Sequence, residues 1–197
     1  MYKRIFDIVL STIALLFLLP IIIFFYFLIL IFDNQNPIFT QYRSGLNYKQ
    51  FKIYKFKSMK VDQNKNKLFV TKLGRFIRLL KIDEVLQLVN VIKNEMSIVG
   101  PRPLYPEFNK FYKKRHSVRL NVNPGITGLA QIKLRDSTNW NRKFNFDVIY
   151  VKKMSLKLDI YIVINTLVLI FQSLIDRKNR PLESIDYKDH FFKNYKL

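Results

Sequence analysis

Two adjacent carboxylates, Asp83 and Glu84, stand at the start of a predicted helix with the cations Arg78 and Lys81 just before them. The N-terminus of a helix stabilises anions, so we expect Asp83 to be ionised there. An ionised carboxylate can act as a nucleophile or as a ligand for a hard cation, and Mg²⁺ prefers such oxygens. Acidic residues are also common at helix starts simply because they stabilise the helix, so these residues alone leave both interpretations open.

Arg102 is the second candidate functional residue, because it stands between Pro101 and Pro103, which restrict the backbone around it. A guanidinium group matches phosphate oxygens with two parallel hydrogen bonds. The alternative is a tight structural turn with a solvated arginine. Lys57 and Arg135 are further candidate phosphate ligands, although a single cation among 34 Lys and Arg residues carries little information.

The composition narrows the classes of function. The 34 Lys and Arg residues stand against 14 Asp and Glu, which gives a formal net charge of +20. This excess indicates a polyanionic partner: nucleic acid, an anionic membrane surface or a phosphorylated substrate. The chain has no cysteine, so disulfides and thiolate metal sites are excluded. His116 and His190 lack the spacing of metal ligands, and no phosphate-loop or dinucleotide-binding fingerprint is present.

An almost uninterrupted apolar run from Ile8 to Phe32 predicts a membrane segment, since about 20 apolar residues suffice to cross a bilayer as a helix. The basic pair Lys3 and Arg4 precedes it, as in a signal peptide. The run is longer than the roughly 7–15 residues of a signal-peptide core, and no small-residue cleavage site follows, so we expect it to be retained. An anionic leaflet therefore becomes the first polyanionic partner to consider.

The charges around this segment favour the cytoplasm at both of its ends, because basic residues precede it and follow it. A simple crossing satisfies only one end. Pro20 lies near the centre of the run and deprives the carbonyl of Leu16 of its helical partner, so a helix–break–helix hairpin that enters one leaflet satisfies both ends. A kinked crossing helix is the alternative. We expect Asp7 to stay near the interface, where it caps or pairs.

The chain as a whole predicts a mostly helical α+β fold. We divide the chain into a membrane segment at 1–33, a catalytic domain at 34–176 and a polar tail at 177–197. The expected elements are a β-hairpin of 38–42 and 51–56, a loop at 61–67, helices at 68–80, from 83 onward, at 105–116 and at 140–153, non-helical chain at 99–103, and a turn-rich loop at 123–128. The apolar stretch 156–175 carries its polar residues on one face, which favours an interfacial helix, or one packed on the domain, over a second crossing.

The order of these motifs resembles that of the bacterial sugar transferases, specifically the small monotopic phosphoglycosyl transferases. The resemblance runs from Lys3 to about Asp159 and so covers most of the chain. It is carried by the basic pair with Asp7, Phe39-Thr40-Gln41 with Arg43 and Gly45, the basic strand Tyr54-Lys55-Phe56-Lys57-Ser58-Met59, Asp83-Glu84 followed by Leu86-Gln87-Leu88 and Asn90-Val91, Met96-Ser97-Ile98-Val99-Gly100-Pro101-Arg102-Pro103, and Pro124-Gly125-Ile126-Thr127-Gly128 with Ala130-Gln131.

This resemblance implies transfer of a phosphosugar from a UDP-sugar to polyprenyl (undecaprenyl) phosphate, with release of UMP, as the first step of glycoconjugate assembly. It implies that Asp83 is the nucleophile and holds Mg²⁺ at least in part, and that Glu84 assists the acceptor phosphate or orients the site. It implies phosphate- or nucleotide-binding roles for Arg78, Arg102, Arg135 and Lys57.

The resemblance also implies a re-entrant membrane hairpin in the bacterial inner (cytoplasmic) membrane, with the catalytic domain facing the cytoplasm and amphipathic helices at the interface. Nucleic acid is not an expected partner on this interpretation. The competing hypothesis is a non-enzymatic, membrane-tethered basic module that binds anionic lipid or nucleic acid.

Overall fold

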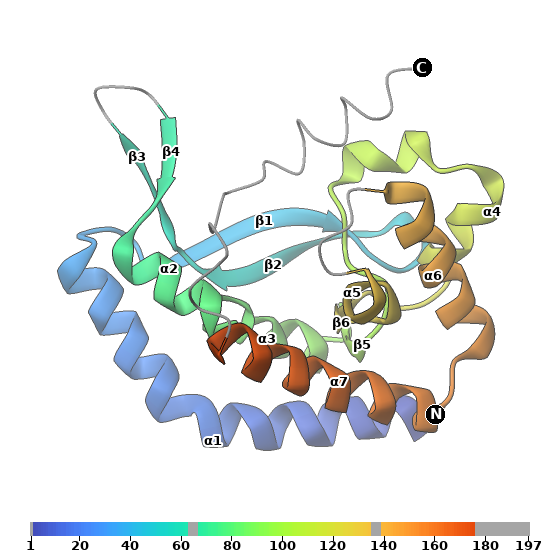
Figure 1. Ribbon diagram of the computed structural model, residues 1–197, viewed down its shortest axis with the longest axis horizontal. Coiled ribbons are helices and arrows are strands. Elements are labelled where there is room, and N and C mark those ends of the chain that lie inside the picture. Colours follow the sequence, from blue (N-terminus) through green and yellow to red (C-terminus); the bar gives the residue numbers. More distant parts are fainter. Residues whose placement is uncertain (1, 63–66, 135–138, 176–197) are drawn as a thin grey trace.

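The computed structural model describes residues 2–62, 67–134 and 139–175 of the 197-residue chain. The described part is a mostly helical α+β structure in which a long helix, α1 (Tyr2–Phe32), runs beneath a small domain (Figure 1). Its strands form three two-stranded sheets within the described ranges. The mostly helical α+β class, with small sheets and a long N-terminal apolar helix, is therefore confirmed.

The N-terminal end of α1 is attached to the domain by polar contacts. Asp7 is buried and accepts hydrogen bonds from the Ser97 hydroxyl at 2.7 Å and from the Ile98 N–H at 3.2 Å. The Arg4 guanidinium donates to the carbonyls of Val91 at 2.6 Å and Ile92 at 3.0 Å, which lie in the last turn of helix α3 (Gln87–Ile92). Basic side chains commonly satisfy helix carbonyls in this way. The predicted pairing of Asp7 is confirmed.

The C-terminal end of α1 is attached to the same domain by apolar packing. Phe25 and Ile29 are buried in one cluster with Phe56 and Ile77. Just beyond the helix, Asp33 accepts a hydrogen bond from the Thr71 hydroxyl at 2.9 Å, so both ends of α1 contact one domain.

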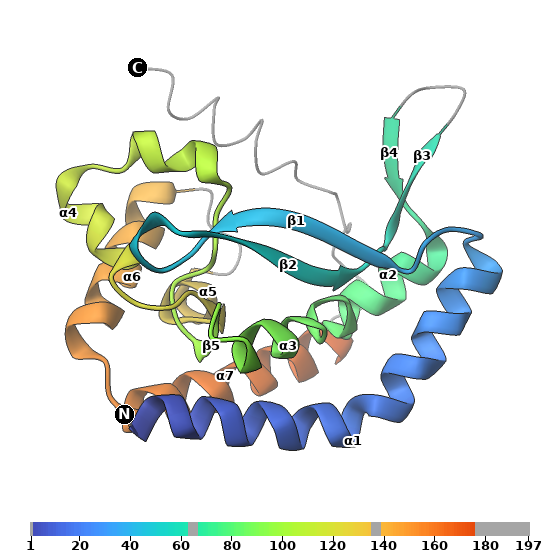
Figure 2. The same cartoon turned by 180° about the vertical axis from the view of Figure 1, so that it is seen from behind.

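Between its ends α1 bends, as the ribbon shows from either side (Figures 1 and 2), and Pro20 lies inside the helix. A proline removes one helical hydrogen bond and is a common cause of such a bend. The structure therefore has a bent continuous helix where we expected helix, break and helix.

Strands β1 (Ile38–Ser44) and β2 (Gln50–Phe56) form the predicted antiparallel hairpin, which is longer than expected at both strands. Its inner face contributes Phe51 and Ile53 to a buried cluster with Val91 and Met96. Asn90 on α3 donates to the Lys52 carbonyl at 2.7 Å and accepts from the Tyr54 N–H at 3.2 Å. These two hydrogen bonds fix the position of α3 along β2.

The expected helix at 68–80 and the ends of the expected loop at 61–67 are partly wrong, whereas residues 63–66 of that loop lie outside the described residues. Strands β3 (Met59–Asp62) and β4 (Lys67–Val70) form a second antiparallel hairpin, and helix α2 (Lys72–Leu79) begins only after it. The Thr71 hydroxyl accepts from the Gly74 N–H at 2.8 Å, an N-cap that determines where the helix starts. The apolar residues with helical spacing, from Leu73 to Leu80, all follow this cap, so the predicted start at residue 68 is too early.

Two other expectations are corrected. The predicted helix at 105–116 is a 3₁₀ segment (Pro106–Phe111) followed by the short α4 (Lys114–Ser117). The loop at 123–128 contains β6 (Gly125–Thr127), which pairs in parallel with β5 (Ser97–Val99). A Cβ at Gly125 would clash with the Gly100 backbone, so this pairing requires glycine.

The last helices agree with the sequence. Helix α6 (Trp140–Lys153) and helix α7 (Leu156–Ile175) have the predicted bounds, and the short α5 (Leu129–Lys133) precedes them. Asp159 on α7 is buried against Lys3 at 2.6 Å and the Tyr150 hydroxyl at 2.8 Å. Helix α7 therefore packs on the domain through this polar position.

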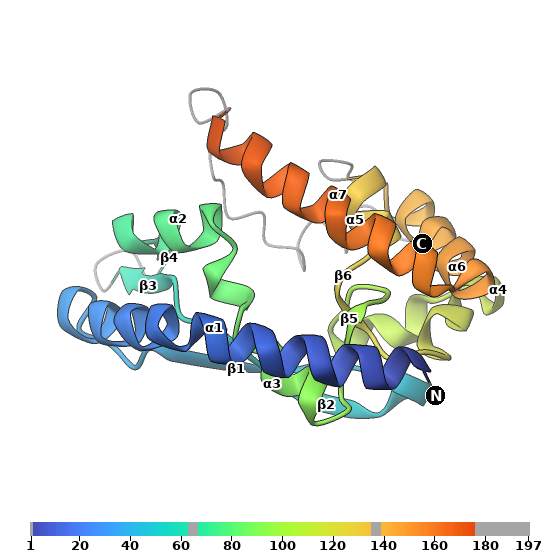
Figure 3. The same ribbon diagram turned by 90° about the horizontal axis from the view of Figure 1, so that it is seen from below.

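Helices α1 and α7 lie across the same side of the domain (Figure 3). Among the described residues, these two helices are long and apolar enough to cross a membrane. Many of their large apolar side chains are exposed. The side that they share is thus rich in exposed apolar side chains.

The attachment of α1 through Asp7 gives a stability prediction. We expect Asp7→Ala to lower the free energy of unfolding by about 1–3 kcal/mol, because the Ser97 hydroxyl and the Ile98 N–H lose a buried acceptor. Thermal unfolding of the purified protein in detergent measures the change. Asp7→Asn, which retains one acceptor oxygen, should lose less, and equal losses in the two variants would contradict the proposed hydrogen bonds.

Candidate active site

A left-handed turn places the two candidate carboxylates. Lys81 has φ 59° and ψ 16°, an uncommon conformation for a residue with a side chain. It redirects the chain from α2 into the 3₁₀ helix η2 (Ile82–Glu84), which leads to α3. Asp83 and Glu84 therefore lie on a short turn between two helices rather than on the first turn of a long one.

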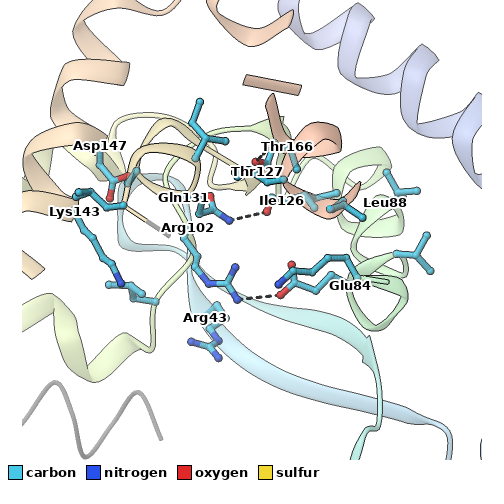
Figure 4. Close-up of a pocket in the computed structure, with 18 of the residues that line it drawn as sticks. Arg43, Glu84, Leu88, Arg102, Ile126, Thr127, Gln131, Lys143, Asp147 and Thr166 are labelled. Atoms are coloured by element: carbon cyan, nitrogen blue, oxygen red, sulfur yellow. Dashed lines mark hydrogen bonds and ion pairs between the residues drawn. The ribbon is translucent and has the colours of Figure 1, made fainter. Parts of the chain in front are cut away.

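Glu84 is buried and shared by two cations. Its Oε1 accepts hydrogen bonds from Lys55 Nζ at 2.7 Å and from Arg102 Nη2 at 2.9 Å, and the second is drawn in Figure 4. Burial opposes ionisation of Glu84, but attraction from Lys55, Arg102 and Lys81 outweighs it and holds the pKa of this carboxyl well below its ordinary value. Glu84 is therefore ionised and committed to its partners.

Asp83 has the opposite character. Its Oδ1 is buried and has no hydrogen-bond partner among the described residues. Burial and the adjacent Glu84 carboxylate raise the pKa of Asp83, while Lys55, Lys81 and Arg78 act in the opposite direction. The sequence prediction considered only the helix N-terminus, which favours the ionised form. Burial acts against the ionised form, and the surrounding cations favour it.

The structure brings together some of the predicted site residues. Arg102 contacts Glu84, and Arg78 lies close enough to Asp83 to affect its pKa while donating to the Ser58 hydroxyl at 2.7 Å. Lys57 is partly buried just after β2, and within the described residues no hydrogen bond or ion pair joins its side chain to Asp83 or Glu84. Arg135 lies outside the described residues.

Sequence analysis missed Lys55 and Arg119. Lys55 stands two residues before Lys57 in the same basic strand, so the motif indicated the right segment without distinguishing its lysines. Arg119 is buried and donates to the Arg102 carbonyl at 2.6 Å and to Asp147 at 3.0 Å. It holds the Pro101–Pro103 turn in place, and nothing in its sequence surroundings indicated this.

A cavity of about 490 Å³ opens beside the Glu84–Arg102 pair. Figure 4 shows Arg43, Glu84 and Arg102 on its wall, with Lys143 and Asp147 farther along. Part of the lining is apolar and comes from the two exposed helices: Leu18, Ile21 and Ile22 of α1, and Leu169 and Ile170 of α7. Another part is aromatic: Tyr105, Phe108, Trp140 and Phe144. The cavity thus joins a charged centre to an apolar wall and an aromatic wall.

The carboxylate oxygens of the site decide which kind of metal ion its donor set suits. The described residues contain no group of three or more His, Cys, Asp or Glu side chains that could enclose a metal. Asp83 does offer a carboxylate oxygen without another partner. Mg²⁺ commonly binds through one or two carboxylates, with water and substrate phosphates as its remaining ligands. The donor set therefore suits Mg²⁺ bound together with a phosphorylated substrate.

The fold and the site define a class of protein: a domain with two long apolar helices, whose adjacent carboxylates stand among lysine and arginine side chains. A sequence model described as "Bacterial sugar transferase" matches residues 1–173. The chain therefore belongs to the bacterial sugar transferase family.

Curated relatives support this assignment. The chain is 40% identical over 168 residues to an uncharacterized sugar transferase, EpsL, of Bacillus subtilis, covering 82% of this chain and 83% of that one. It is 36% identical over 191 residues to the UDP-glucose:undecaprenyl-phosphate glucose-1-phosphate transferase of Escherichia coli, covering 89% of this chain and 40% of that one. The exopolysaccharide production protein PSS of Rhizobium leguminosarum is 38% identical over 191 residues, with 84% and 93% covered. The chain thus spans less than half of the Escherichia coli relative.

The electrostatics of Asp83 give a prediction of pH dependence. If the transfer of a sugar phosphate requires ionised Asp83, its rate falls as the pH drops through the pKa of Asp83, which lies above the ordinary carboxyl value. Lys81→Asn removes a cation that lowers this pKa, and asparagine tolerates the left-handed conformation of residue 81. We therefore expect the acidic limb of the profile of kcat/KM against pH to move to higher pH.

Lys114→Asn, which changes an exposed lysine on α4, is the matched control and should leave the limb in place. A limb that stays in place in Lys81→Asn, or moves to lower pH, would contradict the role of Lys81.

Proposed function

We propose that the protein transfers a phosphosugar from a UDP-sugar to polyprenyl phosphate and releases UMP. The observation that carries this proposal is the position of Asp83, whose uncommitted carboxylate oxygen stands among Lys55, Lys81 and Arg78, next in the chain to Glu84, which lines the cavity. The names of the Escherichia coli and Klebsiella pneumoniae relatives state transfer of glucose 1-phosphate from UDP-glucose to undecaprenyl phosphate.

In the first step, a carboxylate oxygen of Asp83 attacks the β-phosphorus of the UDP-sugar. The bond between this phosphorus and the bridging oxygen breaks, and its electron pair leaves with UMP. The product is a phosphosugar bound covalently to Asp83. Phosphoryl transfer depends mainly on positioning and charge compensation, which Arg102, Arg78 and Lys55 can provide.

In the second step, an oxygen of polyprenyl phosphate attacks the same phosphorus. The bond to the Asp83 oxygen breaks, so the lipid receives the phosphosugar and the carboxylate is regenerated. A phosphate monoester is largely deprotonated near neutral pH, so this attack needs little help from a general base. Glu84, ionised and bound to Lys55 and Arg102, instead orients the cations of the site.

Mg²⁺ would be held by Asp83 together with substrate phosphate, where it would neutralise part of the diphosphate charge. Asp83 Oδ1 is the oxygen that the described residues leave without a partner. The polypeptide contributes the orientation of this oxygen, since the turn at Lys81 and the start of α3 hold residue 83 on both sides.

The same proposal includes a membrane arrangement. Contacts of both ends of α1 with one domain support a re-entrant helix in the bacterial inner membrane, with the domain in the cytoplasm and α7 at the interface. Basic flanks on both sides of the apolar run support the same orientation. The apolar cavity wall formed by α1 and α7 would then face the lipid substrate.

Substitution of the nucleophile tests the reaction. Purified protein with a panel of UDP-sugars, polyprenyl phosphate and Mg²⁺ should release UMP, and Asp83→Asn should reduce the rate at least about a thousandfold, since an amide is a poor nucleophile. Asp186→Asn, the same charge change outside the segment matched by the family model, should keep full activity.

Full activity in Asp83→Asn would refute the nucleophile assignment. No UMP release by the unsubstituted protein with any UDP-sugar, together with salt-sensitive binding of anionic lipid that is indifferent to Asp83, would support the non-enzymatic module instead.

Labelling of single cysteines tests the topology. Because the native sequence has no cysteine, each label reports the position of one introduced residue. We expect Tyr2→Cys and Asn47→Cys both to resist an impermeant maleimide in bacterial spheroplasts and both to react after permeabilisation. Labelling of one site alone from outside would indicate a helix that crosses the membrane.

A further inference from the structure

Arg43 is a cation of the cavity wall that the proposed mechanism leaves without a role. It lies near the end of β1, and its guanidinium carbon stands 3.6 Å from the centroid of the Tyr105 ring. Its Nη2 donates to the Gln41 side chain at 2.7 Å. Its Nε is buried and has no hydrogen-bond partner among the residues that the structure describes.

The backbone holds Arg43 close to Arg102. The N–H of Ser44 donates to the Leu104 carbonyl at 2.9 Å, which joins the end of β1 to the segment that follows the Pro101–Pro103 turn. Arg119 holds that turn from the other side through the Arg102 carbonyl. Two arginines from distant segments thus line one cavity because of fixed backbone contacts, and Figure 4 shows both beside Glu84.

This part of the site has more positive than negative charge. Glu84 attracts Arg43, but its Oε1 already accepts from Lys55 and Arg102. Burial lowers the pKa of Arg43, and the like charge of Arg102 lowers it further. Like charges held close together in a partly dry cavity are costly unless an anion lies near both. A buried donor without a partner adds to that cost.

We propose that Arg43 is a substrate-binding residue that, together with Arg102, holds the diphosphate of the UDP-sugar. A guanidinium stacked on an aromatic ring keeps its edge available for phosphate oxygens, and the ring limits the rotamers that would be lost on binding. This inference rests on the proposed function and deepens it, because it assigns a diphosphate-binding role to a residue outside the Asp83–Glu84 segment.

The lipid phosphate is a second possible source of the same chemistry, but the position of Arg43 favours the nucleotide. Arg43 stacks on Tyr105, which belongs to the aromatic wall of the cavity. The apolar wall that suits a polyprenyl chain comes from α1 and α7 instead. Gln41 and Arg43 stand two residues apart on β1, so their side chains lie on the same face of the strand. Gln41 can therefore hold the Arg43 guanidinium by a hydrogen bond.

Binding measurements on the full-length protein test this role without relying on turnover. We expect Arg43→Gln to weaken the binding of UDP about tenfold to a hundredfold in isothermal titration calorimetry, because a charge-assisted hydrogen bond to phosphate is lost. Uridine, which has no phosphate, should bind with unchanged affinity. Arg43→Lys keeps the charge but loses the planar fork, so UDP affinity should fall between those of the other two proteins.

Steady-state kinetics distinguish the two phosphate sources. In Arg43→Gln the KM for the UDP-sugar should rise about tenfold or more, and the KM for polyprenyl phosphate should stay within about twofold. Arg142→Gln, the same substitution at an exposed position of α6, should match the unsubstituted protein in every measurement.

Unchanged UDP affinity in Arg43→Gln, an equal loss for uridine, or a change only in the KM for the lipid would each overturn the inference. If Arg43→Gln does not fold, judged by thermal unfolding, Arg43→Lys decides by the same comparisons. Failure of the unsubstituted protein to turn over any UDP-sugar would count against the proposed function, whereas unchanged UDP affinity in a folded Arg43 variant would count against Arg43 alone.

Discussion

The rest of the site depends on the ion pairs of Glu84. Its Oε1 joins Lys55 on β2 to Arg102 in the Pro101–Pro103 turn, so three segments that are distant in sequence meet at one charge. A buried carboxylate with one partner removed is strongly destabilising, by about 3–5 kcal/mol for a typical buried pair. Lys55 is subject to the same constraint, because burial lowers its pKa while Glu84 acts in the opposite direction. Neither the strand nor the turn can shift without breaking this cluster.

The same ion pairs explain how two adjacent carboxylates acquire different roles. Glu84 takes Lys55 and Arg102, and the strong attraction keeps it ionised and fixed in place. Asp83 is left with an oxygen that has no partner, and its pKa is raised by burial and by Glu84 itself. Environments that push the pKa values of neighbouring acids apart commonly separate their functions. A nucleophile needs an oxygen that no neighbouring group engages, and an organising residue needs the reverse. The structure distributes these properties to Asp83 and Glu84 respectively.

The features that were predicted correctly from the sequence are those that depend on a local pattern of residues. The apolar periodicity of 140–153 and 156–175 gave α6 and α7 their bounds, and the β-prone runs gave the first hairpin. The carboxylate pair and Arg102 were visible because their residue types are unusual in their settings. What the sequence did not reveal depends on distant partners. Arg119 matters only because Asp147 and the Arg102 carbonyl lie beside it, and Lys55 only because Glu84 does. The three-residue strands β5 and β6 are too short to show a period, and their pairing depends on the close approach of Gly125 to Gly100.

Helix α1 contributes to the cavity as well as being the proposed membrane segment. Leu18, Ile21 and Ile22, on either side of Pro20, line the same cavity as Glu84. The contacts of Asp7 at one end of the helix and of Ile29 at the other fix where this stretch lies against the domain. The bend near its middle therefore affects how the apolar wall lies relative to Glu84. If that wall holds the lipid substrate, as we propose, a straighter α1 would separate the lipid phosphate from Asp83 without altering any charged residue. On this proposal the rate of transfer depends on how deeply α1 lies in the membrane. The contacts at the two ends of α1 fix that depth.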